Sequence, residues 1–316
     1  MAEILSLSSP FFGLIFLGYL AARIVKIPIE GLTWLNTFIL YFALPALFYR
    51  LIASTPIDQL TNWAYIFATS FSTYVAFALA FVVGIVVTRG NIPISTIQGV
   101  AGSYSNIGYM GPGITLAALG PPAAVPTALI FCFDNALLFT LVPFLMALGG
   151  DGAVNFKETA LLVLKRVFFH PFILATIAGV IAAYFQFQPP TAVDRMLEFL
   201  AGAAAPCALF TMGVTVAMRP LKRIPGEMPV LLLIKLVIHP IVVVVMLGLV
   251  GVTDKIWITT AILMAALPPA LNVFILAQQY DTYVERASSV ILVGTVVSVF
   301  TVTGLLYLIT NDLLPI

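Results

Sequence analysis

Apolar stretches of about 20 residues follow one another along almost the whole chain. Hydrophobic residues make up 61% of its 316 residues and charged residues only 9%, whereas a soluble domain carries about 25% charged residues. About 20 apolar residues suffice for a helix to cross a bilayer. The sequence therefore predicts an all-α integral membrane protein with ten transmembrane helices, at 4–25, 31–53, 63–88, 95–119, 122–148, 167–187, 196–218, 228–251, 256–279 and 285–310.

Two of these spans are interrupted, at corresponding places in the two halves of the chain. The first break, at 103–113, reads SYSNIGYMGPG, and the second break, at 265–272, reads AALPPALN. Proline removes a backbone donor, and glycine tolerates conformations that a helix does not use. Inside lipid, the freed backbone groups survive only where they face protein or a wet cavity. Paired breaks of this kind indicate the binding site of a secondary transporter.

The two halves are related by a shift of 161 residues. This shift lays one broken span over the other and superimposes proline and glycine pairs, namely Pro10 with Pro171, Gly18 with Gly179 and Pro45 with Pro206. Because each half has five spans, an odd number, the second half enters the membrane from the opposite side and forms an inverted repeat. We expect repeat one at 1–148, a cytoplasmic linker at 149–166 with a surface helix from Phe156 to Arg166, and repeat two at 167–316.

The distribution of Lys and Arg predicts the orientation. Loops after the odd-numbered spans contain ten of the 14 Lys and Arg residues, and loops on the other side contain three. Cytoplasmic loops carry the excess of these residues, so both termini are expected outside the cytoplasm. The net charge of +1 gives no electrostatic case for a nucleic-acid partner. Cys132 and Cys207 both lie in apolar spans, which predicts no disulfide, metal site or cofactor.

Polar residues at the breaks are the candidates for substrate binding. Helix N-termini carry partial positive charge, so half-helices that meet at the breaks would attract an anion. Asn106 offers an amide and Tyr109 a hydroxyl to a carboxylate, and Asn272 is the polar candidate after the second break. Asn36 and Tyr41, in the span at 31–53, are weaker candidates. The alternative is a proline-kinked helix satisfied by its neighbours, which two breaks in register disfavour.

Asp134 and Asn135 lie in the middle of the span at 122–148. A charged residue at membrane depth costs about 2.5–3.5 kcal/mol on insertion scales, so it is rarely incidental. The functional interpretation is a residue that couples transport to protons or cations, or a wall of the substrate cavity. The alternative is an aspartate that hydrogen-bonds to a neighbouring helix.

Lys235 and His239 are four residues apart and therefore share one helical face. Lys235 is a natural partner for Asp134 or for an anionic substrate, but it could equally snorkel toward the cytoplasmic end of its span. His239 could titrate near neutral pH, or it could hydrogen-bond between helices. Motifs of proteases, hydrolases and phosphate-binding loops are absent from the sequence, which argues against an enzyme.

Three short runs resemble the auxin efflux carrier family, in particular its bacterial branch of malonate and other organic-acid permeases. They are LPALF at 44–48, SNIGYMGP at 105–112, and AAL followed by Pro268 and Pro269. The resemblance implies a homodimer and an elevator mechanism. Spans one, two, six and seven would form the scaffold and the others would move the substrate. It also implies that a carboxylate binds where the broken helices cross, near Asn106, Asn135, Pro112 and Pro268 or Pro269.

The sequence as a whole predicts a secondary active transporter of a small mono- or dicarboxylate in the bacterial inner membrane. Proton coupling through Asp134, Lys235 or His239 is one expectation. A sodium-coupled symporter of the bile-acid type, which shares the inverted repeat, is an alternative, although the breaks lack an acidic residue to hold sodium. A non-transporting sensor or channel that keeps the fold is another.

Overall fold

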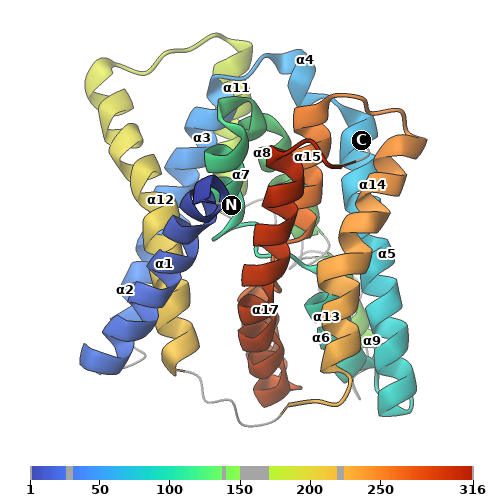
Figure 1. Cartoon of the computed structure of the whole chain (residues 1–316). Helices are drawn as coiled ribbons and strands as arrows, with labels where there is room; N and C mark the ends of the chain where they lie inside the picture. Colours follow the sequence, from blue (N-terminus) through green and yellow to red (C-terminus); the bar gives the residue numbers. More distant parts are fainter. Residues whose placement is uncertain (1, 26–30, 137–139, 150–170, 219–223, 315–316) are drawn as a thin grey trace. The chain divides into compact units, whose positions relative to one another are not determined.

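The computed structural model describes residues 2–25, 31–136, 140–149, 171–218 and 224–314 (Figure 1). Within these ranges every regular element is a helix, so the all-α class is confirmed. Apart from the short helix Ile57–Leu60, the described helices lie in the predicted apolar stretches and differ from them by a few residues at their ends. Most of the predicted linker, from residue 150 on, lies outside the described residues, as does the surface helix expected at 156–166.

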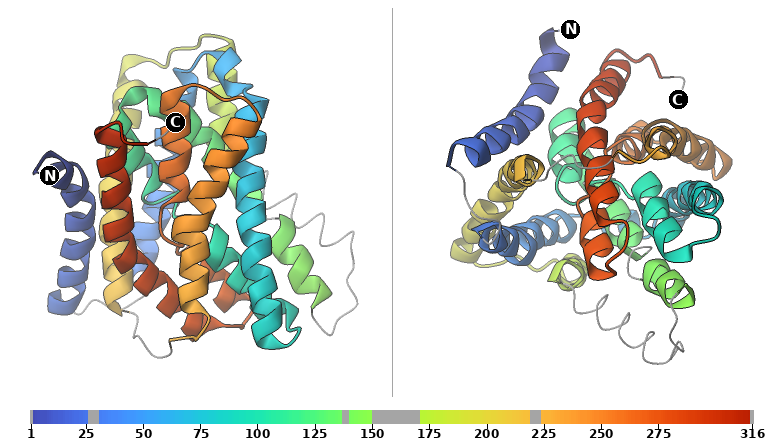
Figure 2. Two further views of the ribbon diagram at one scale, coloured as in Figure 1. Left: turned by 45° about the vertical axis from the view of Figure 1, so that its right-hand side comes forward. Right: turned by 90° about the horizontal axis from the view of Figure 1, so that it is seen from below.

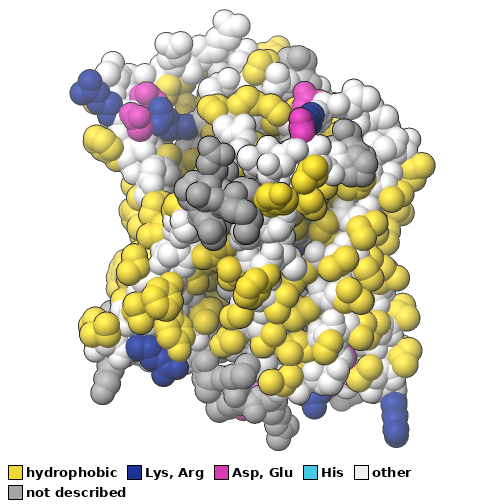
Figure 3. Space-filling view, in the orientation of Figure 1, with side chains coloured by type: hydrophobic (Ala, Val, Ile, Leu, Met, Phe, Trp, Pro, Cys, Tyr) yellow, Lys and Arg dark blue, Asp and Glu magenta, His cyan; other side chains and the backbone are white. Residues whose placement is uncertain are grey.

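Five of the described helices are long and apolar enough to cross a membrane. They are Gly31–Ala53, Trp63–Thr88, Thr191–Met218, Met228–Leu249 and Val284–Thr310. Large hydrophobic side chains project from these helices: Phe67 is 56% exposed and Phe300 is 74% exposed. On the face drawn in Figure 3, hydrophobic side chains lie along the helices, and most charged side chains lie near helix ends. Water would oppose exposing so many apolar groups, whereas lipid accepts them. The chain is therefore a multi-pass membrane protein.

The chain forms two compact units, and each combines segments from both halves of the sequence. Unit 1 comprises Met1–Asn62, Gly108–Cys132 and Phe168–Pro220, and unit 2 comprises Trp63–Ile107, Phe133–Val167 and Leu221–Ile316. Helix α8 (Ala124–Ala136) begins in unit 1 and ends in unit 2.

Unit 1 is held together by helix pairs that approach closely at glycines. Its other elements are α1 (Ala2–Val25), α2 (Gly31–Phe38), η1 (Ile39–Ala43), α3 (Leu44–Ala53), α4 (Ile57–Leu60), α7 (Gly111–Leu119), η2 (Pro121–Ala123), α11 (Pro171–Tyr184) and α12 (Thr191–Met218). Helix α1 packs on α12, and α11 packs on α3. A Cβ atom on Gly213 of α12 would lie 1.8 Å from the carbonyl oxygen of Ile15 in α1. The two backbones can therefore touch only because a glycine stands there.

Unit 2 contains α5 (Trp63–Thr88), α6 (Ile92–Ser103), α9 (Val142–Leu148), α13 (Met228–Leu233), η4 (Ile234–Ile238), α14 (His239–Leu249), α15 (Lys255–Ala265), α16 (Asn272–Gln279) and α17 (Val284–Thr310). Helix α5 packs against both α6 and α14, as the left view of Figure 2 shows for α5 and α14. Side chains cap the two helices that lead into the breaks. Asn91 accepts from the backbone N–H of Ile94 at the start of α6, and Asp254 accepts from Ile256 and Trp257 at the start of α15. Such caps satisfy donors that a helix start leaves free.

A π-helical turn interrupts one long helix in each unit, and each turn ends two residues before a proline. In unit 1, η1 joins α2 to α3 just before Pro45, and in unit 2, η4 joins α13 to α14 just before Pro240. The residue after each turn donates its N–H to the carbonyl five residues back. A proline clashes with the carbonyl four residues before it, and the wider π-turn accommodates that clash without ending the helix. The turn in unit 2 carries Lys235.

Candidate functional site

The two breaks meet in unit 2 and pair through their backbones. An isolated antiparallel bridge joins Ser105 to Pro269. The N–H of Asn106 donates to the carbonyl of Pro268 at 2.9 Å, and the N–H of Ala270 donates to the carbonyl of Tyr104 at 3.2 Å. Because prolines have no N–H, the second break can pair only through a proline carbonyl and the donor of Ala270. The pairing satisfies backbone groups that lipid could not satisfy.

Three asparagines predicted from the sequence lie in unit 2 with this pairing. Asn106 is 1% exposed and Asn135 is 6% exposed. The hydroxyl of Tyr104 donates to Oδ1 of Asn135 at 2.7 Å and also interacts with the side chain of Asn272, the first residue of α16. Tyr104 therefore links α8 to the start of α16, where the helix dipole places partial positive charge. The surroundings offer amide donors, a helix N-terminus and buried carbonyls, which suits a small anion with several acceptor atoms.

The ionisable candidates form one hydrogen-bonded chain in the same unit. The hydroxyl of Thr73 lies 3.1 Å from Oδ2 of Asp134 and 3.3 Å from Nε2 of His239. Nδ1 of His239 lies 3.4 Å from Nζ of Lys235, which donates to the carbonyl of Ala265 at 2.5 Å. Asp134, Lys235 and His239 are all at least 96% buried.

Lys235 does not snorkel, so that alternative from the sequence is wrong. Its side chain is fully buried, and its ammonium lies at the last residue of α15, beside the second break. A helix C-terminus carries partial negative charge and leaves its last carbonyls free, which attracts a cation. Ser105 of the first break points its hydroxyl to the same carbonyl, at 3.4 Å. The ammonium therefore contacts the structure that both breaks form.

Tyr109 and Pro112 belong to unit 1. The Tyr109 side chain is 8% exposed, and its hydroxyl donates to Oδ1 of Asn36 at 3.5 Å. Pro112 lies in the first turn of α7, where its missing N–H costs no hydrogen bond. The weaker candidate Asn36 thus has a partner among the stronger ones, whereas Tyr41 is 58% exposed.

Sequence reasoning missed three residues that organise the site. Each could have been identified from the sequence. Tyr104 and Ser105 are polar residues inside the first break, and Thr73 is a hydroxyl residue in the middle of an apolar span. Within the described part of the chain, no group of three or more His, Cys, Asp or Glu residues is placed to hold a metal ion.

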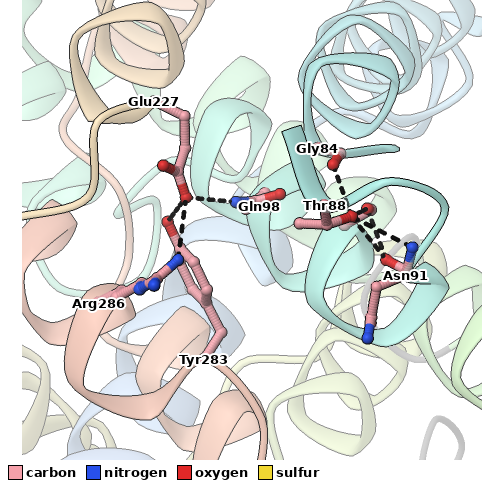
Figure 4. Close-up of polar contacts among 8 residues, drawn as sticks. Gly84, Thr88, Asn91, Gln98, Glu227, Tyr283 and Arg286 are labelled. Atoms are coloured by element: carbon pink, nitrogen blue, oxygen red, sulfur yellow. Dashed lines mark hydrogen bonds and ion pairs between the residues drawn. The ribbon is translucent and has the colours of Figure 1, made fainter. Parts of the chain in front are cut away.

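A second buried polar cluster in unit 2 was also missed, and Figure 4 shows it. Oε1 of Glu227 accepts from Nε2 of Gln98 at 2.6 Å and from the hydroxyl of Tyr283 at 2.7 Å. The Arg286 guanidinium lies 3.9 Å from the same oxygen. Burial, aided by Glu227, raises the pKa of Tyr283 above its ordinary value, so its hydroxyl stays protonated and donates. The cluster ties the residue before α13 to α6 and to the start of α17.

Comparison with known proteins places this architecture in a family. A model of the family described as membrane transport protein matches residues 8–306. A protein of Rhizobium meliloti (strain 1021), named "Putative malonate transporter", is 54% identical over 315 residues, which cover 100% of this chain and 98% of that protein. An "Uncharacterized transporter" of Methanothermobacter thermautotrophicus (strain Delta H) is 26% identical over 205 residues, 63% of each chain. The chain therefore belongs to the membrane transport protein family, which is the auxin efflux carrier family that its sequence motifs resemble.

Proposed function

We propose that the chain is a secondary active transporter that moves a small organic anion across the bacterial inner membrane by alternating access. The pairing of the two breaks in unit 2 carries the proposal, because it gathers Asn106, Asn135 and Asn272 beside the first turn of α16. Membership of a transport family supports movement of a solute rather than catalysis. The name and organism of the 54% identical relative make malonate the first substrate to test and a bacterial membrane the expected location.

The substrate carboxylate would be held by neutral donors and one nearby cation. Amide groups of the three asparagines would donate to it and the N-terminal end of the α16 dipole would attract it, while Pro268 and Pro269 keep the second break open. The buried Lys235 would supply the compensating charge, since an anion in a dry site needs a partner.

The helix bounds support ten spans in two inverted repeats. Moving α6 by 161 residues gives 253–264, where α15 spans Lys255–Ala265. The same shift moves α7 to 272–280, where α16 spans Asn272–Gln279. It moves 124–148 to 285–309, where α17 spans Val284–Thr310. We therefore assign the repeats to 1–148 and 167–316, joined by a cytoplasmic linker, with both termini outside the cytoplasm.

For the transport movement we propose that unit 2 moves as one body and unit 1 is the scaffold of a homodimer. Unit 2 is the mobile candidate because it contains the pairing of the breaks and the buried charges. A site carried on a compact body can face either side of the membrane without being dismantled, which is the requirement of alternating access.

Uptake of radiolabelled malonate into proteoliposomes tests the proposal, with the purified full-length chain. We expect saturable uptake that unlabelled malonate competes away. Asn106→Ala should reduce it by about tenfold or more, because a hydrogen bond to a charged group contributes about 1.5–3 kcal/mol. Asn311→Ala is the matched control, since Asn311 lies exposed at the end of α17. Absence of flux under any imposed gradient would favour a sensor, and a strict sodium requirement would favour a sodium symporter.

A further inference from the structure

We infer that Asp134, Thr73, His239 and Lys235 form a proton-transfer chain that takes up one proton for each anion carried. This inference rests on the proposed function and adds the coupling ion and its path. It also assigns Thr73 the role of a bridge between Asp134 and His239, and the carbonyl of Ala265 the role of an acceptor for Lys235.

The hydrogen bonds of the chain have a single consistent direction. Lys235 as an ammonium has only donors, so Nδ1 of His239 must accept from it and Nε2 must carry the ring hydrogen. That N–H donates to the oxygen of Thr73 at 3.3 Å. The one hydroxyl proton of Thr73 then goes to Oδ2 of Asp134 at 3.1 Å, which is nearer than the Thr69 carbonyl at 3.3 Å. The chain thus runs from a buried cation to a buried anion without a gap.

The same four residues can also hold an arrangement in which Lys235 and Asp134 are both uncharged. In the transfer, Lys235 loses one N–H proton to Nδ1 of His239, and Nε2 of His239 gives its proton to the oxygen of Thr73. The hydroxyl proton of Thr73 joins Oδ2 of Asp134. One N–H bond breaks at Lys235 and one O–H bond forms at Asp134, while His239 only changes tautomer. His239 then returns to its Nε2–H tautomer and a proton from solution restores the ammonium, so the net result is one proton gained on Asp134.

Both ends of the chain adjoin the proposed anion site. Asn135, the neighbour of Asp134, accepts from Tyr104 of the first break, and Lys235 is bonded to the last carbonyl of α15. An anion bound between them would repel the Asp134 carboxylate and attract the Lys235 ammonium, so a proton on Asp134 relieves the repulsion. Of the described residues, Asp134 Oδ1 is a buried oxygen with no hydrogen-bond partner, so it remains open to a donor.

Other titratable groups around Asp134 do not supply the proton. Asp134 acts electrostatically on Tyr65 and Tyr74 of α5 and on Tyr104 after α6, and Lys235 acts on Asp134. Phenols give up protons only near pH 10, far above the range in which the carrier would work. The chain through Thr73 is the path that joins two groups of opposite charge.

Substitution of Thr73 separates coupling from transport. Thr73→Val keeps the shape of the side chain but removes the bridging hydroxyl, and Thr73→Ser keeps the hydroxyl and is the matched control. In proteoliposomes, an inward proton gradient should raise malonate accumulation by the wild type and by Thr73→Ser. Accumulation by Thr73→Val should be the same with and without the gradient. Malonate counterflow, which moves no net proton, should fall much less in that variant. Gradient-driven accumulation by Thr73→Val would overturn the inference.

The number of protons taken up on binding gives an independent test on the wild type alone. Titration calorimetry with malonate, in two buffers of different ionisation enthalpy, should report about one proton bound per malonate. A value of zero with measurable binding would overturn the inference even if Thr73→Val did not fold. If the wild type neither binds nor transports malonate, the proposed function has failed for that substrate. If it transports malonate without binding a proton, only the chain has failed.

Discussion

At the scale of single residues, the buried charges are the costliest feature of the chain. Lys235 and Asp134 would each destabilise the protein if left alone, because an unpaired charge in a low-dielectric interior is expensive. Thr73 and His239 connect them, and the carbonyl of Ala265 accepts from the ammonium. Each charge is tolerable only because the others are present.

Lys235→Met should therefore lower thermal stability in detergent by far more than Lys255→Met does. Removing one partner of a buried pair costs about 3–5 kcal/mol, whereas Lys255 forms an exposed ion pair with Asp312, and such pairs contribute about 0–1 kcal/mol. Adding Asp134→Asn to Lys235→Met should recover part of the loss, because both charges are then gone. Equal melting temperatures for the two single lysine variants would contradict this account of the network.

The sequence predicted the charged members of this network but not the groups that join them. Cost of insertion identifies Asp134, Lys235 and His239 without any structure. Thr73 is 61 residues from Asp134 and 166 from His239 in the chain, so only helix packing brings the three together. A threonine in an apolar span usually bonds to its own helix, which hides an interhelical role.

At the scale of elements, apolar length and proline positions predicted the helices closely, and most errors are at their ends. The fourth span was expected from residue 95, but α6 begins at Ile92 because Asn91 caps it and Pro93 suits its first turn. The wider π-turns before Pro45 and Pro240 were not predicted. Proline inside an apolar span predicts a local distortion of the helix. The sequence does not distinguish a kink from a π-turn, because both relieve the clash of the proline ring with the preceding turn.

The close packing of α1 on α12 requires glycine at Gly213 but not at Gly202, although both lie in α12. A Cβ on Gly213 would lie 1.8 Å from the Ile15 oxygen, whereas a Cβ on Gly202 would meet nothing within 4 Å. Gly213→Ala should lower stability by at least about 1–3 kcal/mol, the usual cost of overpacking. Gly202→Ala should be neutral or stabilising, since alanine favours a helix by about 1 kcal/mol. Thermal unfolding in detergent measures both, and an unaffected Gly213→Ala protein would refute this packing.

At the scale of the whole molecule, the account depends on how the chain crosses the membrane. Charge asymmetry between loops predicts orientation because Lys and Arg are retained in the cytoplasm. A measurement on cells tests this orientation directly.

Labelling of single cysteines with a membrane-impermeant maleimide provides that measurement. In a background with Cys132→Ser and Cys207→Ser, Gln59→Cys should be labelled in cells with a permeable outer membrane. Arg89→Cys should be labelled only after the inner membrane is opened. Both positions are exposed and lie in or next to loops after successive spans. The reverse pattern would invert the topology and place both termini in the cytoplasm.

The central claim is that the paired breaks of unit 2 hold the transported anion. A structure determined by electron cryomicroscopy with saturating malonate tests it most directly. We predict ligand density beside the bridge of Ser105 and Pro269, with carboxylate oxygens in hydrogen-bonding range of Asn106, Asn135 or Asn272. Density for malonate at another place, with this region unchanged and filled only by protein side chains, would contradict the claim.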